Sequence, residues 1–318
     1  MKKTTKRAAK RAVVLKPLPA NARLKGIALM CCAVMCFTGI DTSAKLLNHY
    51  MDNVQVVWAR YLGAFLIGFI FLNPFTEPGL MRTQRPWLQL GRSILLLFST
   101  ILNIFALRYL QLDETMSILF ATPLLVALFS IPILGERIGP RRWAAIILGF
   151  IGVLIITRPG LGHMHPAAIL TVIGTFCFAL YNISTRILST SDSSGTTLFY
   201  SNLFGAVVMS FAVPFVWSWP QGWLQIVVLI VMGTCGALGH YLLILAHRLA
   251  PASILAPFIY TQMIWVVISG YLVFNDLPTR WTLIGGGVVI ASGLYLLYRE
   301  RKVRGEAGPV NSSVEPTQ

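Results

Sequence analysis

The chain is a series of long apolar runs separated by short polar or turn-forming breaks. Each run has 18 to 25 residues, close to the roughly 20 that a helix needs to cross a bilayer. The breaks contain turn pairs such as Asn73-Pro74 and Gly139-Pro140. Ten runs lie near residues 26–47, 54–73, 88–109, 113–134, 141–158, 166–188, 196–217, 223–247, 251–274 and 280–298. This pattern predicts an all-α integral membrane protein with ten transmembrane helices.

The composition leaves no room for a separate soluble domain. Of 318 residues, 56% are hydrophobic and 12% are charged, against about 25% charged in soluble domains. The net charge is +15, but nine Lys and Arg residues fall in residues 1–25 and four in residues 299–318. Basic tails beside a membrane span are typical of anchors at anionic lipid. We therefore expect the lipid bilayer as a partner, no nucleic acid, a basic cytoplasmic N-tail (1–25) and a cytoplasmic C-tail (299–318).

The remaining basic residues indicate the orientation. With ten spans both termini lie on one side, and loops on the cytoplasmic side of a membrane are enriched in Lys and Arg. If the tails are cytoplasmic, 20 Lys and Arg residues lie inside and four lie outside, namely Lys45, Arg108, Arg158 and Arg280. The sequence thus predicts a multi-pass protein with both termini in the cytoplasm.

The second half of the sequence repeats the first at a separation of 140 to 142 residues. Cys36-Phe37, Asp41, Ser43 and Lys45 match Cys177-Phe178, Asn182, Ser184 and Arg186; Trp58, Arg60 and Gly63-Ala64 match Tyr200, Asn202 and Gly205-Ala206; Ala106 and Arg108 match Ala246 and Arg248; Glu136 matches Asp276. Each unit holds five spans, an odd number, so the second enters the membrane from the opposite side. The pattern predicts two inverted five-helix repeats, 26–160 and 161–298, with a substrate site between them near the midplane.

These features resemble a known family. A proline-bearing fourth helix leads into Gly135-Glu136, and Trp143 and a Gly149-x-x-Gly152 helix follow. With the two five-helix repeats, this resembles the drug/metabolite transporter superfamily, EamA type. The resemblance implies a carrier of small metabolites in the bacterial inner membrane, in a family that includes metabolite exporters and importers of riboflavin or S-adenosylmethionine. The second repeat has Asn275-Asp276 instead of Gly135-Glu136, which favours a structural role for the acidic residue.

Charged residues inside the spans are costly and are retained for a reason. Asp41 and Arg60 lie at the same predicted depth on adjacent helices, so we expect an ion pair between them. In the second repeat the equivalent positions hold Asn182 and Asn202, which predicts an amide pair. Each pair is either a static tie between helices or a moving gate. Arg92 and Arg186 lie near the predicted inner ends of their helices, where an interfacial position is expected.

Neutral polar residues inside the other spans are further candidates. Asn103, His240 and Gln262 are either ties between helices or substrate contacts, and His240 is of a residue type that suits proton coupling. The resemblance implies that helices 3, 4, 8 and 9 line a central cavity. The additional candidates for that wall are Phe120, Tyr241, Tyr260 and Trp265.

Prolines and glycines mark places where helices break or approach closely. Pro123 and Pro132 in the fourth span, and Pro251 and Pro257 in the ninth, indicate either kinks or unwound segments. Gly233, Gly236 and Gly239 have helical spacing, which favours close helix packing. The glycines of the last span, Gly285, Gly286, Gly287 and Gly293, indicate either close helix packing or a homodimer face. Neither group has the strand or the Lys-Ser/Thr of a phosphate loop.

The functional prediction is a secondary transporter without a cofactor or metal. The spans contain no nucleophile-and-base, paired-carboxylate or metal motif, which disfavours the alternative of an intramembrane enzyme. No ATP-binding motif is present. The Asp41-x-x-x-Lys45 pattern resembles a cofactor-importing subgroup, and aromatic residues suit a planar ligand. We predict uptake of riboflavin or a similar planar cofactor; export of amino acids or other metabolites, and S-adenosylmethionine transport, are the alternatives.

Overall fold

The structure, a computed structural model, describes residues 20–71, 79–110, 112–136, 138–157 and 166–275, and part of 280–298. These residues form helices and connecting turns without a strand. In the first repeat the helices are α1 (Ala20–Leu47), α2 (Asn53–Phe71), α3 (Pro86–Ala106), α4 (Leu112–Leu119), α5 (Thr122–Leu134) and α6 (Pro140–Thr157). In the second they are α7 (Ala168–Leu188), α8 (Ser194–Ser210), η1 (Val213–Phe215), α9 (Trp223–Leu249), α10 (Ala252–Leu255), η2 (Ala256–Thr261) and α11 (Gln262–Phe274).

The helices follow the ten predicted spans. Seven segments of the described chain are long and apolar enough to cross a membrane. The fourth span is divided into α4 and α5, the fifth is α6, and the last span is helical at its described residues. The fold is therefore the predicted arrangement of ten transmembrane helices in two inverted five-helix repeats.

The fourth helix of each repeat is interrupted, and the interruptions match. In the first repeat α5 begins at Thr122, and in the second α11 begins at Gln262, a separation of 140 residues. Pro123 lies in the first turn of α5 and Pro257 in the first turn of η2. A proline without an N–H is tolerated at the start of a helical segment. For Pro123 and Pro257, an interruption of the helix is therefore favoured over a simple kink.

Helices α5 and α11 end in the same way, with a residue of positive φ. Gly135 follows α5 with φ 69°, and Asn275 follows α11 with φ 57°. Both are left-handed C-caps, a conformation that favours Gly and that Asn tolerates better than most residues. The exchange of Gly for Asn between the repeats therefore preserves the cap.

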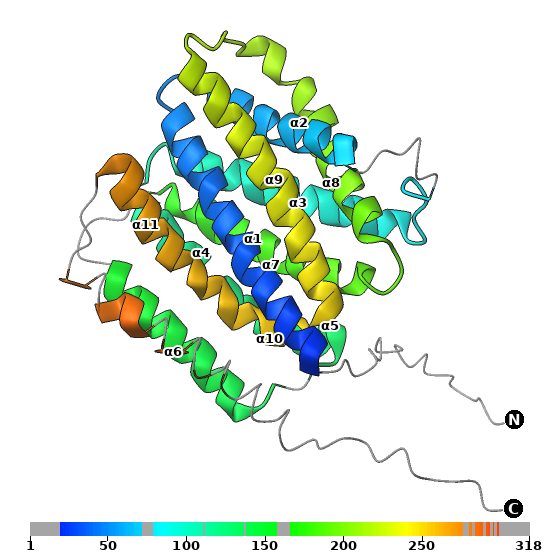
Figure 1. Ribbon diagram of the computed structural model, residues 1–318, viewed down its shortest axis with the longest axis vertical. Coiled ribbons are helices and arrows are strands. Elements are labelled where there is room, and N and C mark those ends of the chain that lie inside the picture. The colour runs from blue at the N-terminus through cyan, green and yellow to red at the C-terminus, as the bar shows by residue number, and fades with distance from the viewer. Residues whose placement is uncertain are drawn as a thin grey trace, which may run out of the picture.

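The third helix of each repeat is inserted into the other repeat. Helix α9 packs along α1 and α2, and α3 packs along α7 and α8; Figure 1 shows α1 and α9 side by side. A Cβ added at Gly233 would lie 2.9 Å from the Cα of Gly63, so α9 and α2 touch at their backbones. The predicted close packing at the α9 glycines is confirmed. The two repeats are thus interleaved, and their interface passes through the centre of the protein.

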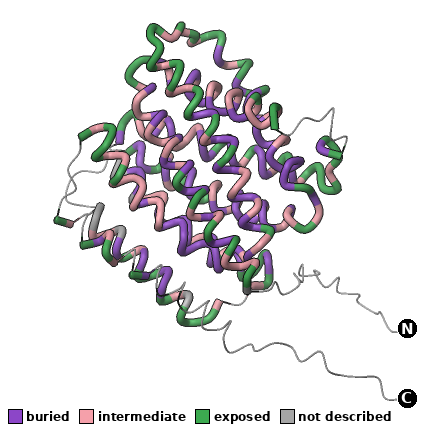
Figure 2. The backbone as a smooth tube through the Cα atoms, viewed as in Figure 1, coloured by how far each residue is buried: buried purple, intermediate pink, exposed green. Residues whose placement is uncertain are grey.

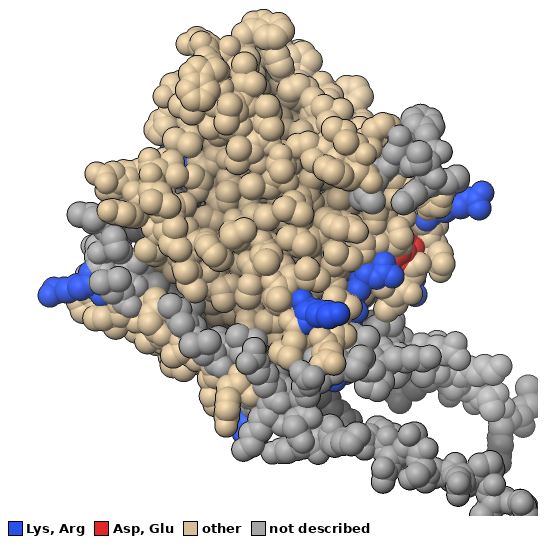
Figure 3. Space-filling view, viewed as in Figure 1, with Lys and Arg blue, Asp and Glu red and all other residues tan. Residues whose placement is uncertain are grey.

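The outer surface suits lipid. Large apolar side chains such as Phe71, Trp87, Phe215 and Trp223 are exposed, and buried residues lie mainly on the inner faces of the helices (Figure 2). Figure 3 shows a face that is almost free of charge, with Lys and Arg at its margins. The described helices therefore turn polar groups inward.

Glu136 joins the end of α5 to the start of α10. Its Oε1 accepts a hydrogen bond from the backbone N–H of Ala252 at 3.1 Å, and its Oε2 accepts one from Ser253 at 2.9 Å. A carboxylate at a helix start satisfies N–H groups that have no partner within the helix. The structural role predicted for Glu136 agrees with these bonds, which tie one repeat to the other.

We expect Glu136→Ala to destabilise the protein by about 1–3 kcal/mol, because two backbone donors lose a shared acceptor. Thermal unfolding of the purified protein in detergent measures the effect. The melting temperature of Glu136→Gln should lie between that of Glu136→Ala and that of the wild type. Gln225→Ala is the matched control, because Gln225 accepts a single exposed bond from the nearby backbone N–H of Gln221. Equal melting temperatures for Glu136→Ala and the control would contradict the role.

Candidate functional site

A cavity of about 100 Å³ lies between the two repeats. Its wall comes from both: α1, α2, α3, α4 and α5 contribute from the first, and α7, α9, η2 and α11 from the second. Phe37 and Phe178, which are equivalent in the repeats, both line it, and their rings meet edge to face with centroids 6.3 Å apart. Thr122 and Gln262, the first residues after the two helix breaks, also line it. The cavity therefore lies where equivalent parts of the two repeats converge.

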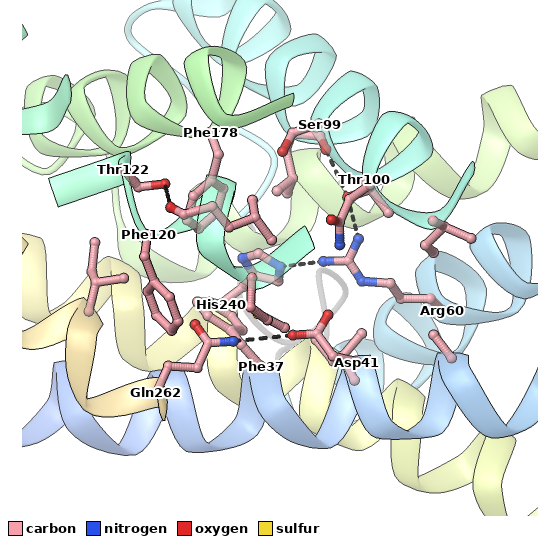
Figure 4. A pocket seen from close by; sticks show the side chains of 18 residues that line it. Phe37, Asp41, Arg60, Ser99, Thr100, Phe120, Thr122, Phe178, His240 and Gln262 are labelled. Atoms are coloured by element: carbon pink, nitrogen blue, oxygen red, sulfur yellow. Dashed lines mark hydrogen bonds between the residues drawn. The ribbon is translucent and has the colours of Figure 1, made fainter. Parts of the chain in front are cut away.

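Asp41 provides the carboxylate among the described residues that line this cavity. It is carried by α1, and its Oδ2 accepts a hydrogen bond from Nε2 of Gln262 at 3.1 Å (Figure 4). Gln262 is the first residue of α11, so this bond joins α1 to the helix break of the second repeat. Among the described residues the other carboxylate oxygen has no hydrogen-bond partner, so it can accept a hydrogen bond from a ligand.

Arg60, carried by α2, provides a positive charge at the same cavity. It is 7% exposed, donates through Nη1 to Oγ1 of Thr100, and contacts Nε2 of His240 through Nη2 at 2.8 Å. A guanidinium can only donate, so Nε2 of His240 must be the unprotonated acceptor. His240 is therefore neutral in this arrangement and carries its hydrogen on Nδ1.

The predicted ion pair between Asp41 and Arg60 is not formed. Within the described chain, Asp41 bonds Gln262, whereas Arg60 bonds Thr100 and His240. The two charges line one cavity but each has a neutral partner. The sequence indicates the depth of a residue through its distance from the helix ends. The partner of that residue depends on which helix lies between α1 and α2, and this helix is α9.

The amide pair predicted in the second repeat is also absent among the described contacts. The side chain of Asn182 donates to the carbonyl of Phe178 in its own helix at 2.8 Å. Asn202 lines a separate small cavity of about 10 Å³ with Phe65, Phe69 and Leu198. Neither asparagine lines the central cavity. The positions in the second repeat that correspond to Asp41 and Arg60 therefore have different surroundings from those two residues.

The other predicted site residues divide into two groups. Asn103 lines the cavity, and its Oδ1 is enclosed without a hydrogen-bond partner in the structure. Tyr260 lies behind the wall, where its ring packs against Phe120 at 6.1 Å between centroids. Trp265 packs against the main apolar core. Thus Asp41, Arg60, Asn103, His240 and Gln262 meet at the cavity, whereas Asn182, Asn202, Tyr260 and Trp265 do not line it.

Arg92 and Arg186 are not interfacial, contrary to the prediction. Arg92 is 0% exposed and Arg186 is 3% exposed. Arg186 donates to the backbone carbonyl of His247, and Arg92 lies among polar groups of α7 and α8. Arg92 is buried against helices of the other repeat and Arg186 contacts α9 of its own repeat, and the distance to a helix end reveals neither contact.

Sequence reasoning missed Phe37, Phe178 and Thr100 as cavity residues. A signal for the two phenylalanines was present, because they belong to the repeated Cys-Phe pair. Equivalent residues of inverted repeats meet where both lie close to the pseudo-twofold axis. Thr100 had no such signal, since a threonine in an apolar span most often bonds its own helix, as Thr100 also does through Leu96.

Comparison with known proteins agrees with this architecture. The profile of the EamA-like transporter family matches residues 24–158 and again residues 165–299. A protein of Rickettsia bellii (strain RML369-C) named "S-adenosylmethionine uptake transporter" is 28% identical over 82% of this chain and 89% of its own. A "Riboflavin transporter" of Vibrio cholerae serotype O1 (strain ATCC 39315 / El Tor Inaba N16961) is 27% identical over 88% of this chain and 95% of its own.

A solved crystal structure of a protein resembles the fold with a TM-score of 0.73, at 14% identity, over 90% of this chain and 99% of that one. At this identity the likeness concerns the fold alone. The named relatives are transporters, and the function is transport rather than catalysis. With one match in each inverted repeat and most of its length covered, this chain belongs to the EamA-like transporter family.

Proposed function

We propose that this chain is a secondary transporter that takes a cofactor-sized metabolite into the cell through the cavity between its repeats. The observation that carries the proposal is the composition of the cavity wall. It combines equivalent residues of the two repeats: Phe37 with Phe178, and Thr122 with Gln262. Thr122 and Gln262 also follow the breaks in the fourth helix of each repeat. Sites at the repeat interface beside discontinuous helices are the common plan of transporters with inverted repeats.

The size of the cavity supports alternating access. About 100 Å³ accommodates a few water molecules, whereas pockets for drug-sized ligands have roughly 300–1,000 Å³. A cofactor can therefore enter only when the repeats move relative to each other. The interleaved packing of α3 and α9 provides the surfaces along which such a movement occurs.

The charges of the cavity favour S-adenosylmethionine over riboflavin. Asp41 and Arg60 line one space without forming an ion pair, so the site offers a negative and a positive group to a ligand. S-adenosylmethionine carries a carboxylate, two cationic groups and an aromatic base. Riboflavin has an aromatic ring system but no charge at neutral pH. Its ring would suit Phe37, Phe120 and Phe178, which makes it the second candidate.

The proposed orientation follows from the basic residues. The tails and inner loops hold most of the Lys and Arg of the chain, which favours cytoplasmic termini. The direction of transport is taken from the relatives that are named as uptake transporters. On these grounds the proposed location is a bacterial inner membrane, and the proposed direction is import.

The first test is uptake of labelled S-adenosylmethionine by bacterial cells that express the protein, with empty-vector cells as the control. We expect saturable accumulation that unlabelled S-adenosylmethionine abolishes and that excess riboflavin leaves unchanged. Accumulation of labelled riboflavin without that of S-adenosylmethionine would reverse the order of the candidates. Accumulation of neither, with the protein present in the membrane, would contradict cofactor uptake.

The second test removes the negative charge of the cavity. Asp41→Asn retains an oxygen that can accept the bond from Gln262 but has no charge for a cationic ligand. A hydrogen bond to a charged group contributes about 1.5–3 kcal/mol, so we expect the KM for S-adenosylmethionine to rise about tenfold to hundredfold.

The matched control is Asp52→Asn. Asp52 lies outside the cavity, where its Oδ1 accepts the backbone N–H of Val54 at 2.8 Å, and asparagine caps a helix equally well. Its KM should equal that of the wild type. Initial rates at matched membrane expression provide the measurement, and equal KM values for the two variants would exclude Asp41 from the ligand site.

A further inference from the structure

A buried cluster of polar groups surrounds Arg92 between α3, α7 and α8. Arg92 is fully buried, and its Nε donates to Oγ1 of Thr185 at 2.8 Å. Its Nη1 donates to the carbonyl of Thr197 at 3.2 Å and to Oγ of Ser201, and its Nη2 donates to the hydroxyl of Tyr181 at 2.8 Å. All these acceptors are neutral. We call these five residues the Arg92 cluster.

The Arg92 cluster is linked to the cavity by hydrogen bonds. The hydroxyl of Tyr181 lies 2.9 Å from Nδ1 of His240, whose Nε2 lies 2.8 Å from Nη2 of Arg60. Because Arg60 fixes the hydrogen of His240 on Nδ1, His240 donates to Tyr181. The oxygen of Tyr181 therefore accepts bonds from both His240 and Arg92. One hydroxyl connects the cavity arginine to the cluster arginine.

The polar contacts continue from the Arg92 cluster to one end of the protein. The side chain of Gln89 donates to Oγ1 of Thr197 at 3.3 Å and to Oδ2 of Asp192 at 2.8 Å. Oδ1 of Asp192 accepts the backbone N–H of Gln84 at 3.0 Å. Gln84 belongs to the segment between α2 and α3, and Asp192 to the turn between α7 and α8. The interface of the two repeats is thus closed by hydrogen bonds from the cavity to these loops.

The equivalent interface on the other side of the cavity is different. There α9 packs on α1 and α2 through small residues. A Cβ at Gly233 would meet Gly63 at 2.9 Å, and one at Gly236 would meet the Cβ of Ala64 at 3.2 Å. Contacts of this kind keep two helices together without polar groups. The contact of α9 with α2 at these glycines is therefore apolar, whereas α3 meets α7 and α8 through the polar groups around Arg92.

We propose that the Arg92 cluster is the inner gate of the transporter, and that Tyr181 and His240 couple it to the ligand site. Separating α3 from α7 and α8 admits water, which replaces the lost hydrogen bonds of Arg92 at a small net cost. A ligand carboxylate that binds Arg60 competes with His240 for the same guanidinium. Loss of that contact frees His240, so the hydroxyl of Tyr181 loses the donor that holds it in place beside Arg92. Cargo binding thereby favours opening toward the cytoplasm.

This inference rests on the proposed function for the identity of the ligand site and the direction of the inner side. A cluster that only stabilised the fold would lower the melting temperature when altered, without changing access to the cavity. A gate changes access from one side. The experiment therefore measures access, which requires no knowledge of the cargo.

Ser99→Cys supplies the reporter, because Ser99 lines the cavity (Figure 4). A membrane-impermeant methanethiosulfonate is applied to inside-out and right-side-out vesicles, and mass spectrometry of the peptide containing residue 99 gives the labelling rate. This readout is unaffected by the native cysteines. In the reporter background, Tyr181→Phe removes the connecting hydroxyl and keeps the ring. We expect labelling from the cytoplasmic side to increase about two- to tenfold, the effect of losing a hydrogen bond that favours the closed state.

Thr234→Val is the control. Thr234 lies in α9, and its hydroxyl donates to the carbonyl of Ile230 in the same helix at 2.8 Å, in an exposed position outside the cluster. Its labelling rate should equal that of the reporter alone. Ser201→Ala, which removes a different acceptor of Arg92, should act as Tyr181→Phe does, and it replaces that variant if Tyr181→Phe does not fold.

The possible outcomes distinguish failure of the proposed gate from failure of the proposed substrate. Unchanged cytoplasmic labelling in both Tyr181→Phe and Ser201→Ala, or an increase only from the periplasmic side, would overturn the gate even if S-adenosylmethionine is transported. Increased cytoplasmic labelling without S-adenosylmethionine uptake would support the gate and reject the proposed cargo.

Discussion

The hydrogen bond between Arg60 and His240 determines how charge is distributed in the centre of this protein. An arginine within a membrane protein needs partners, because the bilayer core provides no water to solvate it. Arg60 finds neutral partners in Thr100 and His240, so the nearby carboxylate of Asp41 does not compensate its charge directly. The cavity consequently holds two opposite charges that are both available to a ligand. The same bond fixes the tautomer of His240 and, through it, the bond to Tyr181.

The repeats supply a symmetric frame, but the chemistry on it is asymmetric. Helices α3 and α9 occupy equivalent places, each inserted into the other repeat, and the two helix breaks and C-caps are in register. Yet α3 carries a buried arginine where α9 carries glycines that touch α2. Duplication therefore accounts for the position of the cavity and the breaks, whereas later divergence accounts for the charges and the polar side of the interface.

The fold could be predicted from the sequence because its determinants are local or repeated. Ten apolar runs set the spans, and the recurrence of residues such as Cys36-Phe37 and Glu136 set the repeats. The partners of Arg60 and the burial of Arg92 could not be predicted in this way. They depend on the insertion of each third helix between helices far away in the sequence. For the same reason Tyr260 and Trp265, which have the residue types of a ligand wall, lie behind it.

A structure of the protein with bound S-adenosylmethionine, determined by cryo-electron microscopy, tests the central claim most directly. We predict that the ligand occupies the cavity between the repeats, with its carboxylate at Arg60, a cationic group at Asp41 and the adenine among Phe37, Phe120 and Phe178. The contact between Arg60 and His240 should be broken in that complex. A ligand bound elsewhere, or one in the cavity that leaves Arg60 on His240 and contacts neither charge, would contradict the account.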